Sequence, residues 1–165
     1  MNAKSNTSNG NESNGLIETI EAIVDDARKR HGLTKTFLTA IATEEGYYVD
    51  GSRPHRNNNP GDLIWGSEAE RFGATHGDPR FAVFPNPQTG WEALKRWFSI
   101  PAHYEDGKLV AGYLGAKIKD AVFRFAPPEE NNSDSYLANV LTWTGLSGED
   151  VLTTEILDGQ NQTEG

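Results

Sequence analysis

Apolar residues recur with the three- to four-residue spacing of amphipathic helices in six stretches of the chain. These stretches are residues 16–31, 35–45, 89–101, 109–125, 133–144 and 149–157. Residues 54–85 lack this periodicity and contain two short apolar runs of strand length, 63–65 and 81–84. The pattern predicts a mainly α protein of the α+β kind, with a helical body and a small β or irregular lobe.

The two ends of the chain differ in composition from its middle. Residues 1–15 are rich in Asn, Ser and Gly and contain only Met1 and Ala3 as apolar residues. Such a segment buries too little apolar surface to offset the entropy of ordering, so we expect a disordered leader. Residues 16–158 are predicted to form one domain, which suits a chain of 165 residues. Residues 159–165 are polar and are expected to form a loose tail.

Charge and composition exclude several classes of function. The net charge is −9, with 24 acidic and 15 basic residues, which argues against a general nucleic-acid binder. No stretch approaches the ~20 apolar residues of a membrane span, and no signal peptide is visible. No cysteine is present, and His76 with Asp78 is too sparse a cluster for a metal site. We therefore expect no metal, no cofactor and no membrane insertion.

Helix geometry distinguishes two adjacent glutamates at the end of the helix at 35–45. Side chains advance by about 100° per residue, which places Glu45 near the centre of the apolar face of Phe37 and Ile41. Glu44 falls on the edge of that face. Burial disfavours a carboxylate and raises its pKa, as a general acid requires near neutral pH. Two alternatives oppose this role: Glu45 could turn to water where the helix ends, or Arg53 and Arg56 could fold back from the following loop.

A dense turn signal follows the glutamates. The run Asn-Asn-Asn-Pro-Gly at residues 57–61 is typical of a tight turn, and amide side chains suit sugar hydroxyl and N-acetyl groups. Aromatic residues flank the turn on both sides: Tyr47, Tyr48, Trp65, Phe81 and Phe84. A carboxylic acid beside amides and aromatic rings is typical of a carbohydrate site.

Three segments resemble the small lysozyme-like proteins of phages and bacteria, which include lytic transglycosylases. They are E-G-Y followed by R-N-N-N-P-G-D-L, then F-A-V-F-P-N-P-Q-T-G-W-E-A-L, then R-F-A-P-P-E-E-N-N-S-D-S-Y-L-A-N-V. The resemblance covers roughly residues 33–146. Asp62 stands where the related pattern usually has Asn, and Phe125 stands where it usually has Tyr.

The resemblance implies a fold and an activity. The fold would be lysozyme-like, with a substrate cleft between body and lobe that Glu45 lines. The activity would be cleavage of the bond between N-acetylmuramic acid and N-acetylglucosamine in peptidoglycan, with Glu45 as general acid. We expect a monomer that acts on glycan strands outside the cytoplasm, in the wall or periplasm or with a phage. The expected binding or auxiliary residues are Asn58, Asn59, Asp62, Trp65, Phe84 and Tyr136.

The sequence leaves several alternatives open. The group that stabilises the oxocarbenium-like centre could be a second carboxylate or the N-acetyl group of the substrate. The candidate carboxylates are Asp62, Asp78, Asp50 and Glu44. Asp62 could instead cap its turn, and Tyr136 could be a core residue. A catalytically silent wall-binding or virion structural protein, or a glycosidase acting on chitin, would also fit the pattern.

Overall fold

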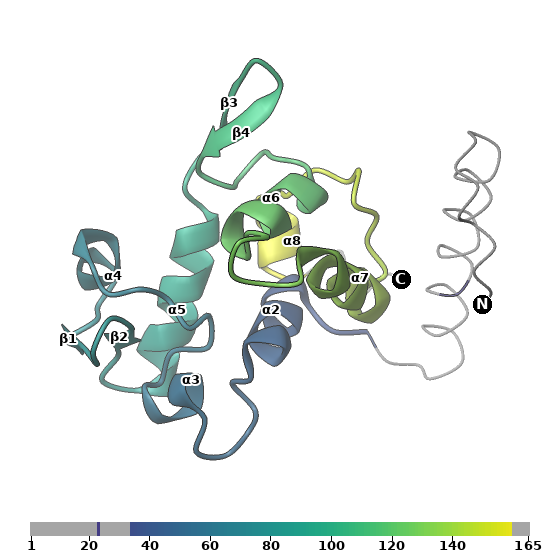
Figure 1. Cartoon of the computed structure of the whole chain (residues 1–165). Coiled ribbons are helices and arrows are strands. Elements are labelled where there is room, and N and C mark those ends of the chain that lie inside the picture. The colour runs from purple at the N-terminus through teal and green to yellow at the C-terminus, as the bar shows by residue number, and fades with distance from the viewer. Residues whose placement is uncertain (1–22, 24–33, 160–165) are drawn as a thin grey trace, which may run out of the picture.

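A computed structural model describes residue 23 and residues 34–159 of the chain (Figure 1). The predicted leader at 1–15, almost all of the predicted helix at 16–31 and residues 160–165 of the tail lie outside the described residues. No helix in the described part is long and apolar enough to cross a lipid bilayer.

The described chain is α+β, with helices and two small antiparallel sheets. The larger helices are α2 (Phe37–Glu45), α5 (Pro87–Phe98), α6 (Ile118–Phe125) and α7 (Ser133–Thr144). The short helices are α3 (Arg53–Arg56), α4 (Ser67–Arg71) and α8 (Thr154–Leu157). The sheets pair β1 (His76–Gly77) with β2 (Ala82–Val83), and β3 (His103–Glu105) with β4 (Lys108–Ala111).

These elements divide into a helical body and a small lobe, as the sequence predicted. In Figure 1, α4, β1 and β2 lie on one side of α5 and form the lobe together with α3, which lies near the lower end of α5. Helices α2, α6, α7 and α8 lie on the other side. Helix α7 packs against α2 and α6, and α8 packs against α2. Helix α5 therefore forms the boundary between lobe and body.

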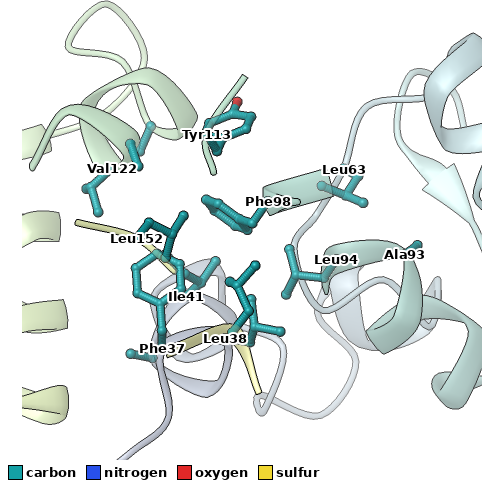
Figure 2. Packing of buried hydrophobic residues seen from close by; sticks show 14 of the residues in the cluster. Phe37, Leu38, Ile41, Leu63, Ala93, Leu94, Phe98, Tyr113, Val122 and Leu152 are labelled. Carbon is teal, nitrogen blue, oxygen red and sulfur yellow. The ribbon is translucent and has the colours of Figure 1, made fainter. Parts of the chain in front are cut away.

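The core fixes the orientation of α2. Phe37 and Ile41 are fully buried, and the Phe37 ring meets Phe98 of α5 edge-on at 5.1 Å between centroids. Figure 2 shows Phe98 at the centre of this cluster, with Tyr113 and Leu94 around it. Because the apolar face of α2 is held by this packing, the direction in which its last residue points is also fixed.

Both ends of α2 are capped by local groups. Thr36 precedes the helix, and its side chain accepts a hydrogen bond from the Thr39 backbone N–H. Gly46 follows the helix at φ 86°, a left-handed conformation that glycine adopts without a Cβ penalty. The helix therefore ends directly after Glu45, and the chain turns away towards the lobe.

The prediction of a single helix over residues 109–125 was wrong. Residues 103–111 form the β3–β4 hairpin, whose turn places Asp106 at φ 52° and Gly107 at φ 79°. An Asp-Gly pair with two positive φ angles is a strong hairpin signal. Gly112, at φ 70°, then lies so close to Pro101 that a Cβ would approach its carbonyl oxygen to 1.8 Å. Only residues 118–125 are helical, because these turns interrupt the apparent periodicity.

The other boundaries differ less from the prediction. Helix α7 has the predicted bounds and ends at Gly145 with φ 77°, and α5 spans Pro87–Phe98 instead of 89–101. Of the last stretch predicted to be helical, 149–157, only α8 forms a helix. The stretch before α8 is extended at Val151, which pairs with Lys117 in an isolated bridge. Of the two predicted strands, 81–84 contains β2, and 63–65 makes only a single bridge, between Ile64 and Phe81.

Candidate active site

Glu45 lies at the end of α2 and is hydrogen-bonded to α7. The Tyr136 hydroxyl donates to Glu45 Oε2 over 2.7 Å, and the Tyr136 side chain is itself buried. Burial is the largest cause that raises the pKa of Glu45, from its ordinary value of 4.5 to about 7. The hydrogen bond from Tyr136 lowers this pKa, and the nearby Asp62 carboxyl raises it. At neutral pH, Glu45 is therefore divided between its protonated and ionised forms.

Glu44 has a different environment although it is adjacent in the chain. Its Oε2 accepts a hydrogen bond of 2.8 Å from Asn139 Nδ2 at the exposed surface. The step of about 100° between neighbouring helical residues separates the two carboxyl groups. The helix geometry thus gives the two glutamates the different surroundings expected from the sequence.

A pocket of about 380 Å³ opens beside Glu45. One side is formed by residues of the lobe, among them residues 61–64 and 80–81, and the other side by residues of the body, among them Trp97, Tyr113 and residues 124–125. Glu45 lines the hollow at the boundary of lobe and body. The volume of the pocket lies within the range typical of small-molecule sites.

Asp62 lines the same pocket but is fully engaged by Arg53. Arg53 Nε lies 3.1 Å from Asp62 Oδ1, and Arg53 Nη2 lies 2.6 Å from Oδ2, which makes a bidentate ion pair. The Asp62 side chain is only 7% exposed. Arg53 also stacks on the Phe81 ring, with 3.5 Å between the guanidinium carbon and the ring centroid. Arg53 does fold back towards Glu45 and lowers its pKa, but it is the smallest of the causes named for that group.

The backbone conformation explains which residue types fit at position 62. Asp62 has φ 49°, in the left-handed region that Asn and Asp adopt more readily than other non-glycine residues. Its N–H donates to Asn59 O over 2.9 Å within the turn. Asp and Asn therefore both suit the backbone conformation at this position.

The other candidate carboxylates do not face the pocket. Asp50 has a fully exposed side chain and lies 3.9 Å from His55 Nε2. Asp78 is exposed in the link between β1 and β2, and Glu44 is directed at Asn139. Asp62 is thus the one of the four candidates that shares the pocket with Glu45.

Asn59, expected to bind substrate, is instead a structural residue. It is fully buried. Its Nδ2 donates to Leu63 O at 3.0 Å and to Ala82 O at 2.9 Å, and its Oδ1 accepts from Leu63 N at 2.9 Å. These bonds leave no group directed at the pocket, and they tie the turn to β2.

Asn58, Phe84 and Trp65 also build the lobe and are not part of the pocket wall. Asn58, at φ 53°, donates from Nδ2 to Phe84 O over 3.0 Å. Phe84 is buried in the core, and Trp65 is half-buried against Gly77, whose Cβ would approach Trp65 Cγ to 2.7 Å. The turn was expected to provide sugar contacts through these side chains. It provides instead the position of Asp62 and the pocket edge at residues 61–64.

Several residues that line the pocket were not predicted from the sequence. Trp97, in the helix predicted at 89–101, was not among the expected site residues, but it is only half-buried and lines the pocket together with Tyr113. Arg80 and Arg124 line it as well. No sequence pattern distinguished these two arginines from the others in the chain. No cluster of three or more His, Cys, Asp or Glu suited to a metal ion occurs in the described part of the chain.

No protein-family model matches this sequence, and no curated protein matches it significantly.

Proposed function

We propose that this protein is a lysozyme-like glycosidase that cleaves the bond between N-acetylmuramic acid and N-acetylglucosamine in bacterial peptidoglycan, with Glu45 as general acid. The observation that carries the proposal is a carboxyl group with a pKa of about 7 at the wall of a pocket. Glycosidic cleavage requires a proton on the leaving oxygen, and a carboxyl group that stays protonated near neutral pH can supply it. The resemblance of three segments to lysozyme-like proteins supports the choice of substrate.

Tyr136 gives the acid a defined orientation. Its hydroxyl occupies Glu45 Oε2, so the transferable proton belongs on Oε1. The same hydrogen bond strengthens once the proton has left and Glu45 carries a negative charge. Tyr136 therefore serves as a positioning residue that also limits how far burial raises the pKa of Glu45.

The N-acetyl group of the substrate is the better candidate for stabilising the oxocarbenium-like centre. Of the four candidate carboxylates only Asp62 lines the pocket, and Arg53 binds both of its oxygens. Glu130 also lines the pocket, but its side chain is exposed. A carboxylate held in a bidentate ion pair is a weak nucleophile, because its lone pairs and charge are already engaged. The proposed reaction thus needs a single enzyme carboxyl group and an N-acetylated substrate.

Asp62→Asn is expected to retain activity within about tenfold of wild type and to lower the pH at which activity is lost. Asn fits the left-handed backbone. Removing the Asp62 charge takes away one cause that raises the pKa of Glu45 and leaves Arg53, which lowers it, without its partner. The pH dependence of kcat/KM measures both effects. A loss as large as that of Glu45→Gln would make Asp62 a catalytic partner.

Product analysis tests the proposed reaction directly. Purified protein should release soluble fragments from peptidoglycan, and mass spectrometry should identify cleavage next to N-acetylmuramic acid. Reducing ends identify a hydrolase, and 1,6-anhydro ends identify a transglycosylase. Cleavage of chitin oligomers in preference to peptidoglycan would favour the chitin alternative. Binding to cell walls without any product would favour the catalytically silent alternative.

A further inference from the structure

Two arginines face the pocket without a carboxylate partner. Arg80 precedes β2 in the lobe and Arg124 lies on α6 in the body, and both line the pocket. Neither forms an ion pair with any residue that the structure describes. Both side chains are exposed, and they lie on opposite sides of one pocket in a chain of net charge −9.

Aromatic rings support both guanidinium groups. The guanidinium carbon of Arg80 lies 5.0 Å from the centroid of the Phe81 ring, and that of Arg124 lies 5.5 Å from the centroid of the Tyr113 ring. A cation–π contact does not occupy the N–H donors of a guanidinium, which has five of them, so donors remain available although Arg124 also hydrogen-bonds to the Tyr113 side chain. Those N–H groups are the donors that bind a carboxylate in the bidentate manner.

The remaining charges of the pocket leave a positive excess. Arg53 and Asp62 neutralise each other in their ion pair. Glu45 is mostly protonated below pH 7 because its pKa is raised to about that value. Glu130 is then the single negative charge of the lining that opposes Arg80 and Arg124. Below pH 7 the pocket lining therefore carries one net positive charge, which favours an anion there although the whole protein carries −9.

We infer that Arg80 and Arg124 form an anion-binding subsite, which binds a carboxylate carried by the muramyl residue of the glycan. This inference rests on the proposed function and narrows its substrate class. N-acetylmuramic acid differs from N-acetylglucosamine by a lactyl ether that ends in a carboxyl group. That group is a free carboxylate in glycan without peptide, and it is amide-linked in intact wall to a stem peptide with carboxylates of its own. Chitin carries neither, so the subsite discriminates against it.

Binding to an inactive variant tests the inference apart from catalysis. Glu45→Gln protein is titrated by calorimetry with three tetrasaccharides: neutral chitotetraose, a muramyl glycan with free lactyl carboxylates, and the same glycan with stem peptides. Arg80→Gln, Arg124→Gln and the double variant are made in this background. Arg96→Gln is the matched control, since Arg96 is exposed, stacks on Phe72 at 4.6 Å and does not line the pocket.

We expect a muramyl glycan to bind more tightly than chitotetraose. Arg80→Gln and Arg124→Gln should each weaken the binding of the muramyl glycan by roughly three- to tenfold. In these variants the affinity for chitotetraose should stay unchanged. Arg96→Gln should have no effect, and Glu130→Gln should tighten the binding of the anionic glycans.

If the glycan without stem peptides already binds more tightly than chitotetraose, the arginines bind the lactyl carboxylate. If only the glycan with stem peptides does so, the arginines bind a carboxylate of the stem peptide. Equal affinity for neutral and anionic glycans, no binding at all, or a preference that survives in the double variant would overturn the inference. Calorimetry measures binding and not turnover. A failure of the proposed cleavage would therefore appear in the product analysis, independently of these binding results.

Discussion

Glu45→Gln is expected to reduce peptidoglycan cleavage by at least about a thousandfold, within the range that general acid catalysis supplies. Glutamine keeps the shape of the side chain, and its carbonyl oxygen can still accept the hydrogen bond from Tyr136. The substitution removes only the proton that must reach the leaving oxygen. The measurement is kcat/KM on solubilised peptidoglycan, with circular dichroism to show that the fold is unchanged.

The matched control is Glu44→Gln. It makes the same chemical change one residue earlier in α2, at a carboxyl group that contacts Asn139 and does not line the pocket. Activity should stay close to that of wild type. If Glu44→Gln were inactive and Glu45→Gln active, the assignment of the general acid would be wrong.

The same assignment fixes the shape of the pH profile. The acid works only when protonated, so activity should fall about tenfold per pH unit above the pKa of about 7. Tyr136→Phe removes a hydrogen bond that lowers this pKa, so the alkaline limb should move to higher pH in that variant. An alkaline limb that already begins near pH 5 in the wild type would contradict the burial of Glu45.

The parts of the site that were predicted from sequence depend on local signals. The pattern of α2 shows which side of the helix is buried, and Gly46 marks where it ends, so the surroundings of Glu45 follow from about ten residues. The bounds of α7 were predicted for the same reason. These features need no knowledge of how distant segments pack. Tyr136 on that helix was named as an auxiliary residue through the resemblance to lysozyme-like proteins and not from a local signal.

The parts that were missed depend on contacts between distant segments. The amide of Asn59 looks available for a sugar, but it bonds to Ala82 O, 23 residues away, and the sequence gives no sign of this. Trp97 has the spacing of a core residue, and only the arrangement of lobe against body turns it towards the pocket. The β3–β4 hairpin is a different case, since its Asp-Gly signal was present at 106–107 and was outweighed by a coincidental helical period.

Glu45→Gln is also expected to stabilise the folded protein at alkaline pH. The pKa of Glu45 is raised in the folded state from 4.5 to about 7, so the folded protein binds more protons than the unfolded chain between these values. The free energy of unfolding therefore falls as the pH rises through this window. A shift of this size corresponds to about 3 kcal/mol of stability, which is lost between pH 4.5 and pH 7 and stays lost at higher pH. Glutamine has no charge to bury and should not show this loss.

Urea unfolding at pH 4 and pH 8.5 measures the effect. At pH 4 the carboxyl group is largely protonated in both states, so wild type and Glu45→Gln should have similar free energies of unfolding. At pH 8.5 the variant should be more stable by about 3 kcal/mol, a large share of the stability of a typical domain. Glu44→Gln, which leaves the buried carboxyl group in place, should keep the pH dependence of the wild type. If Glu45→Gln lost stability with pH as the wild type does, the buried carboxyl would not be the source of that loss. An enzyme that is less stable where its acid is ionised, and more stable without that acid, is the expected consequence of holding a general acid in an apolar wall.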